Sequence, residues 1–189
     1  GELKEITDRI FERLMKDAGG RPIWVPLSGG LDSRLILCTL ATKGYDNLHA
    51  FSYGVPGNYE ARIAKIVAHK VGVPWIFVPI GRRDFHDFYN SQERHDYWKF
   101  SDFLSSVPNM QDLLPLKKML GDRAISSNAV LVNGQSGDFI TGGHIPQILL
   151  KNGFNRHNMF DAIINKHFAQ WKDYLKPDNV SGIIRNLME

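Results

Sequence analysis

The strongest constraint on the fold of this chain is an alternation between short apolar runs and helical periodicity. Residues 23–27, 48–53 and 75–80 are apolar runs of strand length. Between them, residues 31–40 and 59–71 place apolar side chains at three- and four-residue steps, which is typical of helices that bury one face. Two strand–helix–strand units in succession predict a parallel sheet with right-handed crossovers. The pattern therefore predicts an α/β fold with a doubly wound parallel sheet.

Further elements are predicted on both sides of these two units. Residues 129–132 form a strongly apolar run that ends at Asn133 and Gly134, and we expect them to be a fourth parallel strand. Residues 82–98 are expected to form helices that cap the sheet. Helical patterns also occur at 3–15, 110–120, 145–150, 159–171 and 180–188.

Composition places the chain among ordinary globular proteins. It has 189 residues, of which 43% are hydrophobic and 23% charged. Its single cysteine, Cys38, cannot form an internal disulfide, which is typical of cytoplasmic proteins. The sequence has no apolar run near the roughly 20 residues that span a bilayer. These two features predict a soluble, cytoplasmic protein. The net charge of +3 is spread along the chain, so neither a nucleic acid nor a membrane is expected as a partner.

The most informative segment is Ser28-Gly29-Gly30-Leu31-Asp32-Ser33, between a predicted strand and a predicted helix. Adjacent glycines allow positive φ and a close approach to an anion, and the first N–H groups of a helix point at the same place. The two serine hydroxyls add donors, and the natural partner of the Asp32 carboxylate beside a phosphate is a magnesium ion. The segment therefore predicts a site for a metal pyrophosphate, although an ordinary strand-to-helix turn would also suit these residues. It lacks the lysine of a Walker A loop.

A second polar segment follows the predicted fourth strand. Residues 133–144 read Asn-Gly-Gln-Ser-Gly-Asp-Phe-Ile-Thr-Gly-Gly-His. Loops at the carboxyl ends of two parallel strands meet at the same edge of a sheet. Asp32 and Asp138 could therefore bracket one metal pyrophosphate from two sides.

These segments carry a family resemblance. The Ser28 loop resembles the pyrophosphate loop (PP-loop) of the N-type ATP pyrophosphatases, and with Arg34 after it the loop is most similar to the asparagine synthetase-like branch. Residues 133–144 resemble the second motif of that branch. The resemblance implies an adenine nucleotide alpha-hydrolase-like fold with additional helices toward the C-terminus. It also implies a synthetase that uses ATP and Mg²⁺ to activate a substrate carboxylate as an acyl-adenylate, with release of pyrophosphate, before ammonia or an amine forms the amide.

The resemblance assigns roles to individual positions. Catalytic roles fall on Asp32, Asp138 and Gln135, and the two aspartates would also hold the metal. The pyrophosphate would be bound by Ser28, Gly29, Gly30, Leu31, Asp32 and Ser33. Adenine and ribose would be bound by Pro26, Leu27, Ser52, Tyr53, Gly54, Asn133 and Gly134. For Arg34 two interpretations remain, because its guanidinium could support the pyrophosphate or could face solvent.

Two departures from the family pattern keep other functions open. Gln135 stands where the family usually has an acidic residue, and Phe139 replaces the glutamate after the metal aspartate. A neutral glutamine cannot act as a general base. The alternatives are a degenerate nucleotide-binding module without full catalysis, or another PP-loop ATP pyrophosphatase of the tRNA-modifying, NAD synthetase or GMP synthetase type.

We expect residues 1–189 to be a single PP-loop synthetase domain taken from a longer protein, since the chain begins with Gly1 and not with methionine. By the resemblance, the chain lacks an N-terminal glutaminase domain and the C-terminal part of the synthetase domain. The expected partners are a small-molecule carboxylate acceptor, ammonia or an amine as donor, and a glutaminase domain in the full-length protein.

Overall fold

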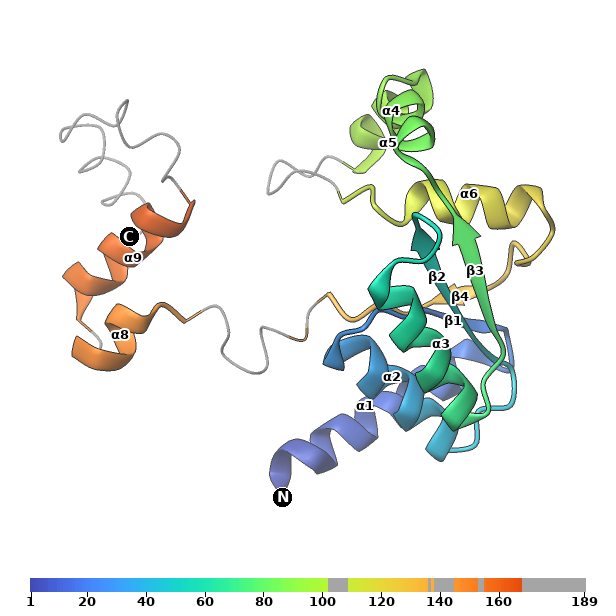
Figure 1. Ribbon diagram of the computed structural model, residues 1–189. Coiled ribbons are helices and arrows are strands. Elements are labelled where there is room, and N and C mark those ends of the chain that lie inside the picture. The colour runs from blue at the N-terminus through green and yellow to red at the C-terminus, as the bar shows by residue number, and fades with distance from the viewer. Residues whose placement is uncertain (102–108, 136, 138–144, 153–154, 168–189) are drawn as a thin grey trace. The chain divides into compact units, whose positions relative to one another are not determined.

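The computed structural model describes residues 1–101, 109–135, 137, 145–152 and 155–167 (Figure 1). The chain divides into two compact units, Gly1–Gln135 and Ser136–Glu189. In the second unit, the helices predicted at 145–150 and 159–171 are present as α8 (Gln147–Asn152) and α9 (Arg156–His167), which contact each other. The helix predicted over 180–188 lies outside the described residues.

The first unit is built on a parallel sheet in the strand order β3-β2-β1-β4. Its strands are β1 (Ile23–Pro26), β2 (Leu48–Gly54), β3 (Trp75–Pro79) and β4 (Val130–Leu131). Successive strands move outward from β1 to β3, and the chain then crosses to the other side of β1 to add β4. The switch of direction therefore lies between β1 and β4, and open α/β sheets bind their ligands at the carboxyl ends of the strands at such a switch.

Helices cover both faces of this sheet. They are α1 (Glu2–Ala18), α2 (Leu31–Thr42), α3 (Tyr59–Val71), α4 (Arg82–Tyr89) and α6 (Leu113–Gly121), while α5 (Gln92–Ser101) contacts α4. Figure 1 shows α1, α2 and α3 together on one side, where they pack on alternate sheet residues such as Val25 and Ala50. The opposite face, with Trp24 and Phe51, packs on α4 and α6. Burial on both faces confirms the doubly wound α/β fold.

Within the described residues, the predicted elements are confirmed in type, and the differences lie at their ends. The strand predicted at 129–132 is reduced to the two residues of β4. The helix predicted over 110–120 begins only at Leu113 and has Pro115 in its first turn, where a proline is tolerated because the missing N–H has no acceptor within the helix. Among the described residues, none of the helices combines the length and the apolar character that a bilayer crossing requires.

Candidate functional site

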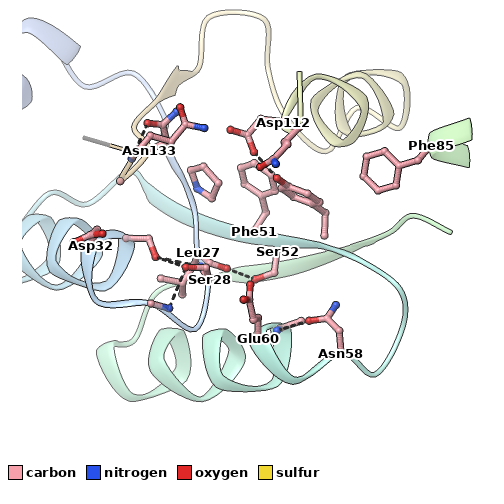
Figure 2. Close-up of a pocket in the computed structure, with 18 residues that line it drawn as sticks. Leu27, Ser28, Asp32, Phe51, Ser52, Asn58, Glu60, Phe85, Asp112 and Asn133 are labelled. Carbon is pink, nitrogen blue, oxygen red and sulfur yellow. Dashed lines mark hydrogen bonds between the residues drawn. The ribbon is translucent and has the colours of Figure 1, made fainter. Parts of the chain in front are cut away.

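A cavity of about 640 Å³ opens at the carboxyl ends of β1, β2 and β4. Its walls come from the loops that follow these three strands and from residues close to the starts of α3 and α6. Figure 2 shows Ser28 and Asp32 on one side of the cavity and Asp112 across from Ser28. The cavity lies where the strand order predicts a ligand site.

Two serine hydroxyls hold the Ser28 loop in shape. The Ser28 Oγ accepts a hydrogen bond from the Gly30 N–H at 3.1 Å, and the Ser33 Oγ accepts one from the Ser28 N–H at 3.2 Å. The two hydroxyl oxygens are 3.2 Å apart. Gly30 is the N-cap of α2 and provides no side-chain acceptor, so the first N–H groups of this helix stay available to an anion.

The glycines of this loop provide space and do not use the positive φ that glycine allows, since neither Gly29 nor Gly30 has a positive φ. Gly30 has φ −77° and ψ 175°, an extended conformation that any residue adopts. A Cβ on Gly30 would lie 3.2 Å from the Ser28 Oγ, closer than ordinary van der Waals contact. A side chain at this position would therefore press on the hydroxyl that closes the loop.

The loop after β4 lies directly on the first turn of α2. A Cβ on Gly134 would lie 2.8 Å from the Ser33 backbone nitrogen and 2.9 Å from the Asp32 Cβ. Only a glycine permits this approach, which brings Asn133 and Gln135 to the same cavity as the half-buried Asp32. The predicted meeting of the two motifs at one edge of the sheet is thus present for these residues. Asp138, the second predicted metal ligand, lies outside the described residues.

The residues predicted to bind adenine and ribose divide into two groups. Pro26, Leu27, Tyr53 and the buried Ser52 line the cavity, whereas Gly54 is not among the lining residues. The Ser52 Oγ donates to the Leu27 carbonyl at 2.6 Å and accepts from the Trp75 Nε1 at 3.0 Å. The Ser52 hydroxyl therefore joins β1 to β2 and β3 and is engaged within the protein.

Sequence reasoning missed the wall opposite the Ser28 loop. It consists of Phe85, Gln111 and Asp112. The Tyr53 hydroxyl donates to the Asp112 Oδ1 at 2.8 Å, and burial, with the nearby Asp112 charge as a smaller cause, raises the pKa of Tyr53. Asp112 is 59 residues away from Tyr53 along the chain and belongs to no local motif, so only the packing of α6 on the sheet brings the two together.

The donors around the cavity suit a magnesium ion that is shared with phosphate oxygens. Within the described part of the chain, no cluster of three or more His, Cys, Asp or Glu side chains could hold a metal alone. Magnesium usually takes only one or two carboxylates when a substrate phosphate completes its shell. Asp32, in the first turn of α2 beside the available N–H groups, fits such a role.

Arg34 contacts the backbone of the loop. Its Nη2 donates to the Gly29 carbonyl at 3.1 Å, while its Nε is buried without a hydrogen-bond partner among the described residues. The contact present is with the loop backbone, and Arg34 does not line the cavity, so support of a pyrophosphate by this guanidinium stays a prediction. Gly29 and Leu31 are likewise not lining residues, and Leu31 is 74% exposed.

Comparison with known proteins gives the family. The model of the asparagine synthase family matches residues 2–153, and the chain belongs to this family. The chain is thereby placed among the ATP-utilising synthetases of PP-loop type. Among solved structures it is similar to an NH3-dependent NAD synthetase from Campylobacter jejuni subsp. jejuni NCTC 11168 in complex with the nitrate ion. The identity is 11%, the TM-score is 0.47, and the match covers 97% of this chain and 92% of that chain. None of the curated proteins matches the chain.

Proposed function

We propose that this chain is an amide-forming synthetase that activates a substrate carboxylate with ATP. The observation that carries the proposal is the junction of the two loops, where Gly134 lies on the backbone of Asp32 and Ser33 at the uncapped start of α2. This junction places N–H donors, two hydroxyls and a carboxylate around one end of the cavity. That set of groups suits a magnesium pyrophosphate.

The proposed reaction has two steps. A carboxylate oxygen of the acceptor attacks the α-phosphorus of ATP, and the bond from that phosphorus to the bridging oxygen of pyrophosphate breaks. The products are an acyl-adenylate and pyrophosphate. Ammonia or an amine then attacks the acyl carbon, AMP leaves with the bonding electron pair, and the nitrogen loses a proton as the amide forms.

In this proposal the chain contributes mainly electrostatic stabilisation. The N–H groups at the start of α2 would face the departing pyrophosphate, with Ser28 and Ser33 keeping the loop in place. Asp32 and Asp138 would hold Mg²⁺, which supplies charge neutralisation when bound. Pro26, Leu27, Tyr53 and Asn133 would surround the adenine and ribose, and the backbone of Gly30 and Gly134 would complete the nucleotide site.

The proposal is tested by calorimetric titration of the folded chain with ATP and Mg²⁺. Binding in the micromolar to millimolar range is expected, with weaker binding when magnesium is left out. Asp32→Ala and Ser28→Ala should each weaken it by about tenfold or more, equivalent to about 1.4 kcal/mol. Asp17→Ala is the matched control, because the Asp17 side chain on α1 is 68% exposed and outside the cavity. Folded protein that binds no ATP, or that binds it equally well in all variants, would contradict the proposal.

A second candidate function is nucleotide binding without full catalysis. Gln135 lines the cavity at the position where the family usually has an acidic residue, and its neutral amide cannot take a proton as a general base. Exchange of labelled pyrophosphate into ATP in the presence of an acceptor acid distinguishes the two functions. The synthetase requires acid-dependent exchange, whereas a binding module binds ATP without it.

The same proposal extends to the partners and the compartment. The acceptor is a small carboxylic acid, and the nitrogen comes from ammonia or an amine, which a glutaminase domain of a longer protein would supply. The reduced state expected of Cys38 suits the cytoplasm. Neither a nucleic acid nor a membrane is part of the proposed function.

A further inference from the structure

A second cavity, of about 410 Å³, adjoins the first on the side of β4 and α6. The two cavities share lining residues, among them Asp112, Asn133 and Gln135. Ser28, Asp32 and Ser33 line only the first cavity. The second cavity therefore begins where the nucleotide site ends, beyond Asn133 and Gln135.

The inner wall of the second cavity is largely apolar. Leu113 and Leu116 come from α6 and Leu131 from β4, and Tyr97 of α5 adds an aromatic ring whose hydroxyl donates to the Asn109 carbonyl at 2.8 Å. Apolar walls of this kind favour a ligand with an apolar body over a compact, fully polar one, because burial removes the ligand's apolar surface from water.

Asp112 is the charged residue of this wall. Lysine and arginine do not occur among the lining residues that the structure describes. The partner described for the Asp112 carboxylate is the neutral hydroxyl of Tyr53. Within the part of this wall that the structure describes, a second carboxylate on a ligand would therefore lie beside a like charge without a cation, whereas an ammonium group would find a counter-charge.

We propose that the second cavity binds the acid that is activated, and that this acid has one carboxylate and an apolar body bearing a protonated amine that faces Asp112. This inference rests on the proposed function. The carboxylate would lie at the shared border, where the Asn133 side-chain oxygen accepts from the Gln135 N–H at 3.3 Å and leaves the Asn133 amide nitrogen as a donor. An acceptor with two carboxylates, such as aspartate, is disfavoured by this arrangement.

Three acids with six carbons test the charge preference directly. Hexanoate, 6-aminohexanoate and adipate differ at the carbon farthest from the shared carboxylate, where the group is neutral, cationic or anionic, respectively. Their affinities for the whole 189-residue chain can be measured by ligand-observed nuclear magnetic resonance. We expect 6-aminohexanoate to bind best and adipate worst, with about a tenfold or larger difference between the two. Adipate that binds as well as 6-aminohexanoate, or no binding by any of the three, overturns the inference.

A variant that adds a positive charge to the wall locates the binding. Leu131 is 44% exposed and lines only the second cavity, so Leu131→Lys places a cation in the wall at little cost to folding. It should strengthen adipate binding and weaken 6-aminohexanoate binding, each by about threefold or more. Leu120→Lys is the matched control, because Leu120 is 48% exposed on α6 and lines neither cavity. Equal behaviour of the two variants overturns the inference.

Titration of the same preparations with ATP and Mg²⁺ separates this inference from the proposed function. Leu131→Lys should leave the ATP affinity within about twofold of the wild type. Normal ATP binding without the expected order of acids overturns the second cavity as the acceptor site and leaves the ATP site standing. If the three acids bind in the expected order but the protein binds no ATP, the proposed function is overturned. The role of the bound acid as an acceptor is then overturned with it.

Discussion

Gly134 lies so close to the backbone of Ser33 that no side chain at position 134 would fit between them. A Cβ on Gly134 would lie 2.8 Å from the Ser33 backbone nitrogen, a distance that real Cβ atoms do not adopt. The loop after β4 and the first turn of α2 are thereby held together at the carboxyl edge of the sheet, although they are about a hundred positions apart in the sequence. The shape of the candidate phosphate site depends on this contact.

Gly134→Ala is expected to disturb the site directly. The new methyl group must displace backbone on one side or the other, at a cost of about 1–3 kcal/mol in the free energy of unfolding. Affinity for ATP with Mg²⁺ should fall by about tenfold, because the N–H groups at the start of α2 would shift. Urea unfolding and calorimetric titration measure the two effects. Gly121→Ala is the control, since a Cβ there meets nothing within 4 Å, and an unchanged ATP affinity in Gly134→Ala would contradict the argument.

Ser52→Ala should reduce stability more than ATP binding. The substitution leaves the Leu27 carbonyl and the Trp75 Nε1 without the hydroxyl that now satisfies both, which costs about 1–3 kcal/mol. The free energy of unfolding, measured in urea, should fall by that amount, whereas the folded protein should bind ATP within about twofold of the wild type. Ser126→Ala removes an exposed hydroxyl and serves as the control. A selective loss of ATP affinity at full stability would instead give Ser52 a direct role in binding.

Tyr53→Phe should flatten the dependence of stability on alkaline pH. Burial raises the pKa of Tyr53 in the folded protein, and the neighbouring Asp112 adds to the shift, while an unfolded chain ionises tyrosine near pH 10. The folded state thus holds this proton more tightly, so its contribution to stability is complete below about pH 10 and is lost as the pH rises further. Urea unfolding between pH 9 and about 11 should show a steeper decline for the wild type than for the variant. Parallel curves would mean that Tyr53 does not contribute in this way.

Arg34→Met should weaken ATP binding without touching the cavity wall. The variant loses the hydrogen bond from Nη2 to the Gly29 carbonyl, which is worth about 1 kcal/mol, and ATP affinity should fall by about fivefold as the loop loosens. Arg34→Lys keeps the charge and one possible donor, so its affinity should lie between those of the wild type and Arg34→Met. Equal losses in the lysine and methionine variants would indicate that the planar guanidinium, and not merely a cationic donor, is required.

The elements near the N-terminus were predictable because their signals are local. The helix predicted over 59–71 is α3 in full, since apolar spacing, the Asn58 side chain that accepts from the Ala61 N–H, and Gly72 at φ 77° all lie within one stretch of sequence. The position of the Ser28 loop at the end of a strand followed from the same local reasoning.

The opposite wall of the cavity was beyond any local pattern. Asp112 reaches Tyr53 only because the strand order β3-β2-β1-β4 and the packing of α6 bring distant segments to one edge. Likewise, Ser52 has the residue type of a ligand contact, yet its hydroxyl is engaged by Leu27, directly after β1, and by Trp75 of β3.

Residue periodicity and the two loop motifs thus decided the fold class, the order of the elements and the edge of the sheet that holds the site, because each of these depends on neighbours along the chain. Tertiary packing decided which residues face one another across the cavities, which hydroxyls remain available and where charge lies unpaired. These properties depend on distances between segments that are remote in sequence, and those distances arise only when the strands pair and the helices close on both faces of the sheet.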